Sequence, residues 1–352
     1  MKTIVSIVGI RPDFIRMSNV FRLLDKEFNH IIIHTGQHFD DALSGSFFKE
    51  LNIRNPDYNL NIGKSGKEHF YQVSELSIKI IELFREKRIN PDLILFLGDS
   101  NSVLASVPLK KEGYKIGHIE AGMRSGDRRM LEEINRTVCD HCSDYFFVYH
   151  SNYKINLIRE GINPDSIFVV GNTIVEVCSE LSKNICLKES KKSHIILDIH
   201  RPENFNSKDR LSWIINYAES CGERYDVPVF ALSFKRMCEK IFEFGIKHKN
   251  VSFVPLMGYK DYLQSVMDSL FLISDSGTAQ EEPAFVGTKV IVPRDFTERK
   301  ESVESKCSFM LNKNNEQYSY KFIESDFEGN TDWMGFGDTS NKIVSHLKDI
   351  LR

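Results

Sequence analysis

Acidic residues gather near the middle of the chain, where apolar runs end. Asp99 follows the run Leu93–Leu97 closely, and Glu120 follows Ile116–Ile119 directly, while Glu132 lies in the helical pattern that comes next. Carboxylates at the carboxyl ends of parallel strands are positioned to exchange protons with a bound ligand. Any one of them alone could be a helix cap or a solvated turn residue. The three together predict acid–base chemistry.

A second group of small and hydroxyl-bearing residues lies in the second half of the chain. Ser276, Gly277 and Thr278 follow an apolar run and precede a predicted helix. Small side chains there let a diphosphate approach backbone N–H groups, and hydroxyls add donors. Glu282 falls about one helical turn later, where a carboxylate can hold a ribose diol. The alternative is that Ser276 and Thr278 only cap the helix.

Two further turns carry cationic groups. Arg11 lies in the turn before the helix that Pro12 begins, beside backbone N–H groups that could bind phosphate or could belong to an ordinary turn. His200 follows the run Ile195–Ile199, where a histidine can donate to phosphate, transfer a proton or make a structural hydrogen bond. The residues alone leave these alternatives open.

Apolar, β-rich runs alternate with helical patterns along the chain, which predicts parallel sheets covered by helices on both faces. Two α/β domains are expected, at 1–172 and 173–336, with an amphipathic helix at 337–352 that packs back onto the first domain. The predicted strands are Thr3–Val8, His30–Thr35, Leu93–Leu97, Ile116–Ile119, Tyr145–Tyr149, Ile167–Val170, Ile195–Ile199, Val229–Leu232, Val251–Val254, Leu270–Ser274 and Lys289–Val292.

Composition excludes several classes of protein. The 352 residues include 46 basic and 49 acidic ones, a balance that argues against a nucleic-acid partner. No apolar run is long enough to span a membrane. Seven scattered cysteines indicate free thiols in the cytoplasm. Cys139-Asp-His141-Cys142 lacks a second ligand pair, so no metal is expected. Because neither a GxGxxG nor a P-loop pattern occurs, no cofactor is expected either.

Taken together, the motifs resemble the non-hydrolysing UDP-N-acetylglucosamine 2-epimerases. This family has the GT-B fold, in which two Rossmann-like domains with parallel sheets face a central cleft that holds the nucleotide sugar, commonly in a homodimer. The motifs run in the family's order from about Ile4 to Arg299, and they include Gly9-Ile-Arg11-Pro-Asp-Phe-Ile-Arg16, Thr35-Gly-Gln37-His38, Gly98-Asp99-Ser100, His118-Ile-Glu120-Ala-Gly122, Glu132-Glu-Ile-Asn-Arg136, Gly171-Asn172-Thr173, His200-Arg-Pro-Glu-Asn204, Asp275-Ser276-Gly277 to Glu282, and Thr297-Glu-Arg299, with Gly335-Phe-Gly-Asp-Thr-Ser340 in the tail.

The resemblance implies an isomerase that interconverts UDP-N-acetylglucosamine and UDP-N-acetylmannosamine by elimination and re-addition of UDP, for surface polysaccharide precursors. Asp99, Glu120 and Glu132 correspond to the acid–base group, and His200 to a catalytic or phosphate-facing partner. The corresponding substrate-binding residues are Arg11, Arg16, Tyr262, Ser276, Gly277, Thr278 and Glu282.

The chain departs from the family pattern at a few positions. Arg16 replaces a usual lysine, and Thr278 a common glycine. Some relatives have a second, regulatory substrate site that contains a histidine, followed by proline, and a glutamine. In this chain the histidine–proline pair is replaced within Leu232-Ser-Phe-Lys235, and the glutamine is replaced by Asp40. Allosteric activation is therefore not expected. Alternatives are a diacetamido- or deoxy-sugar 2-epimerase, a hydrolysing 2-epimerase, a GT-B glycosyltransferase and a silent UDP-sugar-binding regulator.

Overall fold

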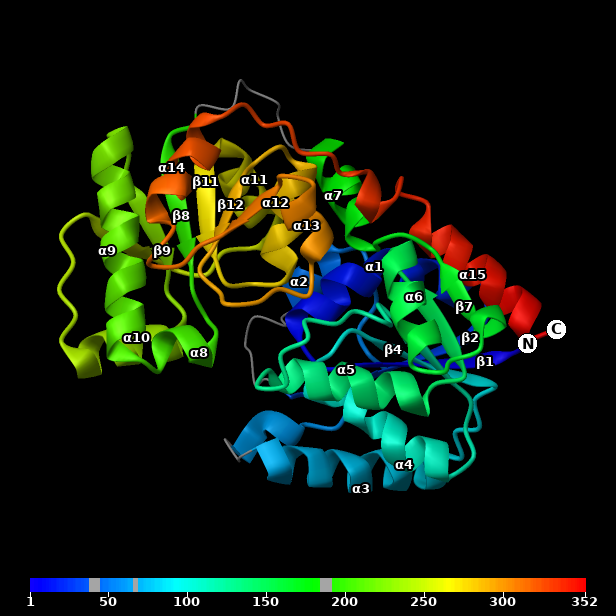
Figure 1. The fold of residues 1–352 in the computed structure, drawn as a ribbon. Coiled ribbons are helices and arrows are strands. Elements are labelled where there is room, and N and C mark those ends of the chain that lie inside the picture. Colours follow the sequence, from blue (N-terminus) through cyan, green and yellow to red (C-terminus); the bar gives the residue numbers. More distant parts are fainter. Residues whose placement is uncertain (38–44, 66–68, 184–191) are drawn as a thin grey trace. The chain divides into compact units, whose positions relative to one another are not determined.

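The protein forms two compact α/β units in a computed structural model that describes residues 1–37, 45–65, 69–183 and 192–352. Unit 1 comprises Met1–Val177 and Met334–Arg352, and unit 2 comprises Cys178–Trp333 (Figure 1). Asp40 and Cys186 lie outside the described residues.

Unit 1 is built on a parallel sheet with the strand order β3-β2-β1-β4-β5-β6-β7. Its order reverses at β1, which pairs with β2 on one side and β4 on the other. A reversal of this kind opens a crevice at the carboxyl ends of the two neighbouring strands. The strands are β1 (Thr3–Val8), β2 (Asn29–His34), β3 (Tyr58–Asn59), β4 (Leu93–Leu97), β5 (Ile116–Ile119), β6 (Tyr145–Val148) and β7 (Ile167–Val169).

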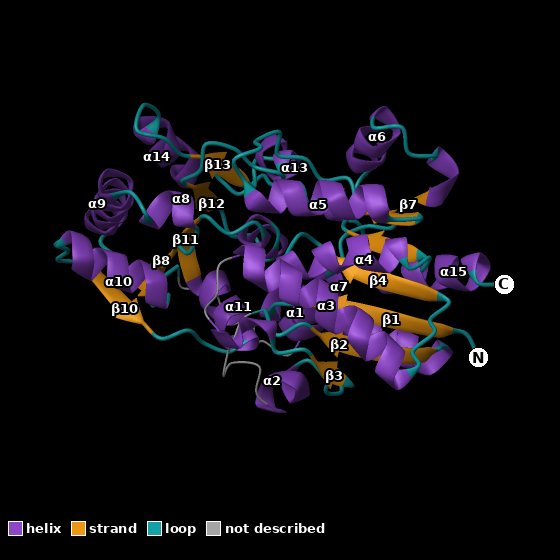
Figure 2. Cartoon of the chain, turned by 90° about the horizontal axis from the view of Figure 1, so that it is seen from below, coloured by secondary structure: helices purple, strands orange, loops and turns teal. Residues whose placement is uncertain are grey.

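Helices flank this sheet (Figures 1 and 2). Leu76, Ile80 and Phe84 of α3 pack with strand residues such as Val5 and Phe96 in one apolar cluster. The helices are α1 (Arg11–Glu27), α2 (Gly45–Glu50), α3 (His69–Lys87), α4 (Ser106–Lys111), α5 (Leu131–Cys142), α6 (Ser151–Arg159) and α15 (Thr339–Ile350), with short 3-10 turns η1 (Ile62–Ser65), η2 (Asn101–Ala105) and η3 (Pro164–Ser166). Helix α7 (Ile174–Lys183) begins in unit 1 and continues into unit 2.

The C-terminal helix α15 belongs to unit 1 and packs against α1. Its apolar stripe is buried at Ile343 and Leu347. At its first turn the backbone N–H of Ser340 donates to Glu176 at 2.8 Å. The amphipathic pattern in the sequence therefore has a partner surface in unit 1.

Unit 2 repeats the topology, with a parallel sheet in the order β10-β9-β8-β11-β12-β13. Its reversal lies at β8, between β9 and β11. The elements are β8 (His194–Asp198), α8 (Pro202–Phe205), α9 (Lys208–Tyr225), β9 (Val229–Leu232), α10 (Lys235–Phe244), β10 (Val251–Val254), α11 (Tyr259–Asp268), β11 (Ser269–Ser274), η4 (Thr278–Gln280), α12 (Glu282–Phe285), β12 (Val290–Val292), α13 (Lys300–Glu304), β13 (Ser308–Met310), α14 (Glu316–Glu324) and η5 (Asp332–Met334).

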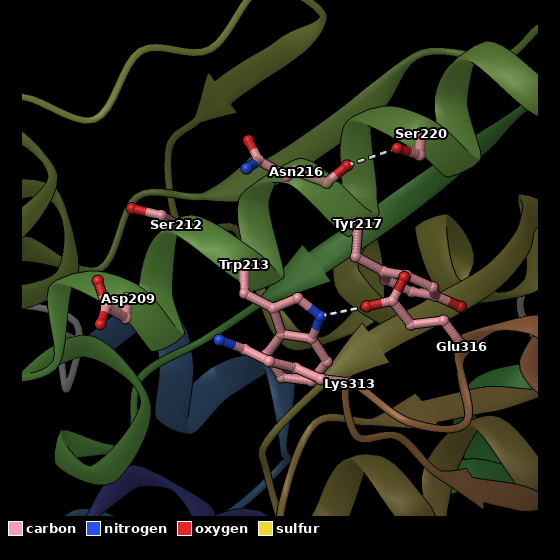
Figure 3. Close-up of a pocket in the computed structure, with 8 residues that line it drawn as sticks. All are labelled: Asp209, Ser212, Trp213, Asn216, Tyr217, Ser220, Lys313 and Glu316. Atoms are coloured by element: carbon pink, nitrogen blue, oxygen red, sulfur yellow. Dashed lines mark hydrogen bonds between the residues drawn. The ribbon is translucent and has the colours of Figure 1, made fainter.

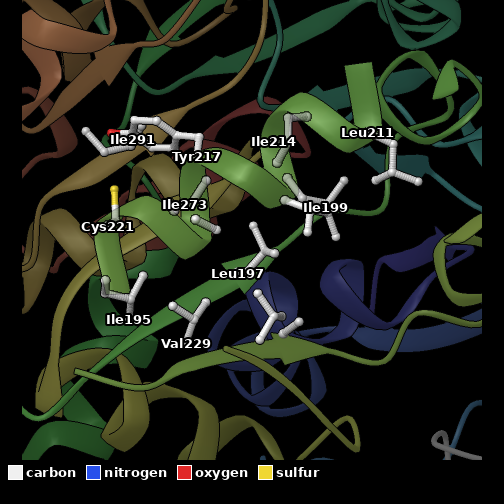
Figure 4. Packing of buried hydrophobic residues seen from close by; sticks show 14 of the residues in the cluster. Ile195, Leu197, Ile199, Leu211, Ile214, Tyr217, Cys221, Val229, Ile273 and Ile291 are labelled. Atoms are coloured by element: carbon white, nitrogen blue, oxygen red, sulfur yellow. The ribbon is translucent and has the colours of Figure 1, made fainter. Parts of the chain in front are cut away.

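The core of unit 2 explains why its strands are apolar throughout. Ile195 and Leu197 of β8 pack with Leu211 and Ile214 of α9 (Figure 4). Ile196, between them in sequence, lies in a different buried cluster. Successive strand residues point to opposite faces, so both faces of this sheet are covered.

The predicted fold class, two parallel α/β sheets, is confirmed. Two strands, β3 and β13, were not predicted. Both are short strands at sheet edges, and each includes a polar residue, Asn59 or Ser308, so neither forms a distinct apolar run. Within the described ranges, no helix combines the length and apolar character that crossing a membrane requires.

Candidate active site

Several predicted site residues of unit 1 lie close to the point where its strand order reverses. The chain leaves β1 at Gly9 and β4 at Gly98, and these two strands are neighbours. β5 pairs with β4 and ends directly before Glu120. An alanine-like Cβ built on Gly98 would lie 3.7 Å from Arg16 Nη1 and 3.8 Å from Glu120 Oε2. Asp99, Glu120 and Arg16 therefore belong to one cluster.

Glu120 and Arg16 form a buried ion pair. Arg16 Nη2 also donates to the Tyr149 hydroxyl at 3.2 Å, and that hydroxyl is 2.9 Å from Thr173 Oγ1. Glu120 has a φ of 70°, in the left-handed region that residues other than glycine rarely adopt. Backbone strain of this kind gathers at active sites, where the surrounding structure maintains it.

Asp99 is held by residues of α5. It forms an ion pair with Arg136, a fully buried side chain whose Nη1 donates to Glu133 at 2.7 Å. Asn135 Nδ2 donates to the Asp99 carbonyl at 2.9 Å. The Asp99 side chain is still 26% exposed, so a ligand can reach it.

The two acids at the start of α5 differ in their surroundings. Glu133 is buried and accepts the backbone N–H groups of Ser125 and Gly126, each at 3.0 Å, so it organises the preceding loop. Glu132 is only partly buried on the first turn of α5. Of the pair, Glu132 is the residue whose exposure suits contact with a substrate.

The turn that begins α1 differs in one respect from the sequence interpretation. Asp13 accepts the N–H groups of Gly9 at 2.9 Å and Ile10 at 3.1 Å, so these donors are already used. Burial raises the pKa of Asp13 to about 6, although those two bonds oppose the shift. Arg11 is partly buried, with its guanidinium 5.2 Å from the Phe47 ring centroid. A phosphate role for this turn therefore depends on the Arg11 side chain.

In unit 2, Asp275 connects the two strands at which the sheet order reverses. Its buried carboxylate accepts the N–H groups of His200 at 3.0 Å and Arg201 at 3.1 Å, and Asn204 Nδ2 at 2.8 Å. The His200 ring Nδ1 lies 3.1 Å from Asp198 Oδ1. Burial opposes the charged imidazole, but Asp275 and Asp198 outweigh it and raise the pKa of His200.

Ser276, Gly277 and Thr278 form a tight turn after β11. Ser276 Oγ lies 3.2 Å from Thr278 Oγ1, so the two hydroxyls are adjacent. A Cβ on Gly277 would come within 2.5 Å of Arg299 Nη1 and 2.7 Å of Glu298 Oε1. Glycine is therefore required there by the close approach of a buried charged pair.

The helix expected after this turn is interrupted. A 3-10 turn, η4, comes first, and α12 begins only at Glu282, which is followed by Pro283. Glu282 is buried and accepts the Tyr259 hydroxyl at 2.9 Å. The Tyr262 ring stacks on Tyr259 with centroids 6.5 Å apart, so Glu282 and both tyrosines form one group.

Several residues that organise these groups were not assigned a role from the sequence. Arg136 follows Glu133 by one helical turn, a spacing that typically pairs charges, but its second partner, Asp99, is distant in sequence. Tyr149 and Tyr259 gave no local signal, because their partners come from other elements.

A groove of about 430 Å³ lies on unit 2 along α9 (Figure 3). Trp213 on its wall donates its indole N–H to Glu316. The groove contains none of the predicted site residues, and its lining is Asp209, Ser212, Trp213, Asn216, Tyr217, Ser220, Lys313 and Glu316.

Comparison with known proteins gives consistent matches. The family model described as UDP-N-acetylglucosamine 2-epimerase matches residues 23–348. A UDP-N-acetylglucosamine 2-epimerase from Methanocaldococcus jannaschii is 34% identical over 361 residues, 97% of each chain. A UDP-2,3-diacetamido-2,3-dideoxy-D-glucuronate 2-epimerase from Pseudomonas aeruginosa is 32% identical over 304 residues, 84% of each chain.

Solved structures match over the whole length. The crystal structure of Methanocaldococcus jannaschii UDP-GlcNAc 2-epimerase in complex with UDP-GlcNAc and UDP has a TM-score of 0.89 at 33% identity, covering 99% of this chain and 100% of that chain. One from Rickettsia bellii has a TM-score of 0.87 at 25% identity, covering 100% and 97%. With the two parallel sheets, these matches establish a GT-B-like fold.

Proposed function

This chain belongs to the UDP-N-acetylglucosamine 2-epimerase family, and we propose that it interconverts UDP-N-acetylglucosamine and UDP-N-acetylmannosamine. The observation that carries the proposal is the cluster of Asp99, Glu120 and Arg16 at the carboxyl ends of neighbouring strands. Carboxylates in such a cluster supply the proton-transfer groups that inversion at a carbon requires.

The substrate's own chemistry defines what the site must do. No carbonyl lies beside C2 in the ring, so its hydrogen is not acidic until the C1–O bond to UDP breaks. The oxocarbenium that forms makes the C2 proton labile, and its loss leaves a glycal with UDP bound. A proton then returns to the other face of C2 while UDP returns to C1. The net result is inversion at C2.

Each predicted residue has a part in this scheme. Asp99, Glu120 and Glu132 exchange the protons, and the exposure of Asp99 and Glu132 supports contact with the sugar. His200 acts as a cationic partner of the departing diphosphate, a role that its raised pKa supports. Arg16 holds the Glu120 carboxylate in place through their buried ion pair.

The remaining predicted residues bind the nucleotide. Ser276 and Thr278 offer adjacent hydroxyls, and Gly277 lies between them in the turn. We assign these residues and Arg11 to the diphosphate. Glu282, oriented by the Tyr259 hydroxyl, holds the ribose diol, and Tyr262 stacks on the base.

Product analysis tests this proposal. After incubation with UDP-N-acetylglucosamine, chromatography and 31P NMR should show the manno epimer still attached to UDP. Free N-acetylmannosamine with UDP as the main product would instead indicate a hydrolysing 2-epimerase. Transfer of the sugar only when an acceptor is added would indicate a glycosyltransferase. UDP binding without any conversion would indicate a regulator.

A modified substrate is a second candidate, because the Pseudomonas aeruginosa relative named as a diacetamido-uronate epimerase is 32% identical. A panel that includes UDP-2,3-diacetamido and 6-deoxy sugars distinguishes the two. The account favours UDP-N-acetylglucosamine, and a much higher kcat/KM for another member of the panel would replace it. The role in precursor supply for surface polysaccharides depends on the same result.

We further propose a homodimer in the cytoplasm. On α3 the side chains of Phe70, Tyr71 and Ile78 are 71%, 54% and 59% exposed, an apolar surface that a second copy could cover. The cysteines within the described residues are free thiols, which suits a reducing compartment. Light scattering after gel filtration measures the mass of the wild type and of Phe70→Ser. A monomeric wild type would contradict the dimer, and a dimer that Phe70→Ser leaves intact would contradict the role of this surface.

A further inference from the structure

His118 is a buried histidine that lies beside the proposed catalytic carboxylates. It lies on β5, and its side chain is fully buried. The ring Nδ1 is 2.7 Å from Asp140 Oδ1 on α5, and Nε2 is 2.8 Å from the carbonyl oxygen of Gly98. The proposed reaction assigns no step to this residue.

The two partners determine the protonation of the ring. A backbone carbonyl can only accept, and Asp140 is a carboxylate whose pKa is lowered by His118 and Arg124 in spite of its burial. Both ring nitrogens must therefore donate, and only an imidazolium has two N–H groups. Burial alone would lower the pKa of His118, but Cys139 and Asp140 hold it well above its ordinary value.

The charges around the ring balance one another. Asp140 also accepts Arg124 Nη2 at 2.8 Å, and Arg124 pairs in turn with Glu160 at the end of α6. The charged neighbours given by these contacts are thus Asp140, Arg124 and Glu160, with the thiol of Cys139 beside the ring.

The imidazolium and Asp140 connect two turns that carry proposed catalytic groups. Nε2 of His118 donates a hydrogen bond to the carbonyl oxygen of Gly98, the residue before Asp99. Gly98 itself has a φ of 70°. Asp140 Oδ2 accepts the N–H of Gly122, two residues after Glu120, at 3.1 Å. A shift of either bond would move a carboxylate relative to the sugar.

We propose that His118 is a permanently protonated positioning residue that, with Asp140, fixes the turn carrying Asp99 to the turn that follows Glu120. The effect on catalysis rests on the proposed epimerase function, whereas the charge of the ring does not depend on it.

His30 offers a matched control in the same sheet. Its Nδ1 also lies 2.7 Å from a carboxylate, Asp25, but its Nε2 lies 2.9 Å from the Ser6 hydroxyl, which can donate. A neutral ring therefore satisfies both contacts of His30, and burial lowers its pKa. His118 and His30 share a carboxylate partner and differ in the second one.

Nitrogen NMR of the full chain labelled with 15N-histidine tests the charge directly. At pH 8, the signals that disappear in His118→Gln should be two similar imidazolium shifts. The signals that disappear in His30→Gln should be two widely separated 15N shifts, which are those of the two ring nitrogens of a neutral imidazole. A neutral His118 at pH 8 would overturn the proposal. Should His118→Gln fail to fold, Asp140→Asn provides the assignment, since it changes the His118 signals and leaves those of His30 unchanged.

Kinetics test the positioning role. His118→Gln and Asp140→Asn should lower kcat by about ten- to a hundredfold, because small displacements of catalytic groups cost rates of that order. KM for UDP-N-acetylglucosamine and the Kd for UDP should stay within about twofold, since the nucleotide-binding residues are untouched. His30→Gln should keep the wild-type kcat. Wild-type kcat in a folded His118→Gln would overturn the role.

A wild-type protein that converts no UDP-sugar would instead contradict the proposed function, while the NMR result on His118 would stand.

Discussion

At the scale of single residues, Glu120 combines two unfavourable features in one place. Its backbone is left-handed, which costs on the order of 1 kcal/mol for a residue with a side chain, and its carboxylate is buried. The ion pair with Arg16 compensates the charge. The arrangement fits an acid that is held in a defined position for chemistry.

Substitution of Glu120 by glutamine keeps its shape and removes its basic group. We expect Glu120→Gln to lower kcat by at least about a hundredfold, the usual scale for losing a general acid or base. UDP affinity, measured by calorimetry, should be retained, because all the proposed nucleotide ligands except Arg11 lie in unit 2. Glu112→Gln is the control, since that acid is exposed and pairs with Arg85 at the surface. Full activity in Glu120→Gln would remove Glu120 from the chemistry.

The sequence could place Asp99 and Glu120 at strand exits, because buried parallel strands produce unmistakable apolar runs. It could not show how these acids are held. Arg136, His118 and Tyr149 make contacts that depend on the pairing of distant elements, and no local pattern encodes those contacts. The roles of the site residues themselves remain predictions that the variants above test.

At the scale of elements, the buried carboxylate of Asp13 in the first turn of α1 makes the folded chain less stable at neutral pH than at low pH. The pKa of Asp13 is about 6 in the folded chain against 3.8 when it is not perturbed. The folded state therefore binds the proton more tightly. Stability from this group is present at low pH and is lost as the pH rises through about 6.

Urea unfolding of wild type and Asp13→Asn measures this effect, because asparagine does not titrate. We expect the unfolding free energy of wild type, relative to Asp13→Asn, to fall by about 2 kcal/mol between pH 4.5 and 7.5. A difference between the two proteins that stays constant with pH would contradict the raised pKa.

The C-terminal helix makes a second prediction at this scale. Ile343 is fully buried where α15 packs in unit 1, so Ile343→Ala should lower the unfolding free energy by about 2–5 kcal/mol. Lys342→Ala, next to it, removes only an exposed ion pair with Asp338 and should cost at most about 1 kcal/mol. Thermal unfolding of both variants checks the contrast, and equal effects would mean that α15 contributes little.

Element types were more predictable than their ends. Long apolar runs predicted the inner strands, and β1, β4, β5 and β9 were predicted with the observed bounds, because two-sided burial demands continuous apolar sequence. The edge strands β3 and β13 were missed because each is short and includes a polar residue, so neither forms a distinct apolar run. The turn after Gly277 was expected to begin a helix, but the helix is split at Glu281 before Pro283.

At the scale of the whole molecule, two units whose first six strands follow the same order have different proposed tasks. Unit 1 carries the acids and Arg11, and unit 2 carries the other proposed nucleotide ligands. UDP at a hundred times its Kd should stabilise the wild type by about 2.7 kcal/mol, measured by unfolding with and without UDP. Glu120→Gln should keep this stabilisation and Glu282→Gln should lose most of it. The reverse pattern would contradict the division of tasks.

The central claim is that C2 of the sugar loses and regains a proton while UDP leaves and returns. Incubation of UDP-N-acetylglucosamine with the protein in deuterated water, followed by proton NMR and mass spectrometry, tests it most directly. The account predicts deuterium at C2 in both the gluco and manno forms, each still attached to UDP. A manno product that retains the original C2 hydrogen, or no conversion of any UDP-2-acetamido sugar, would contradict it.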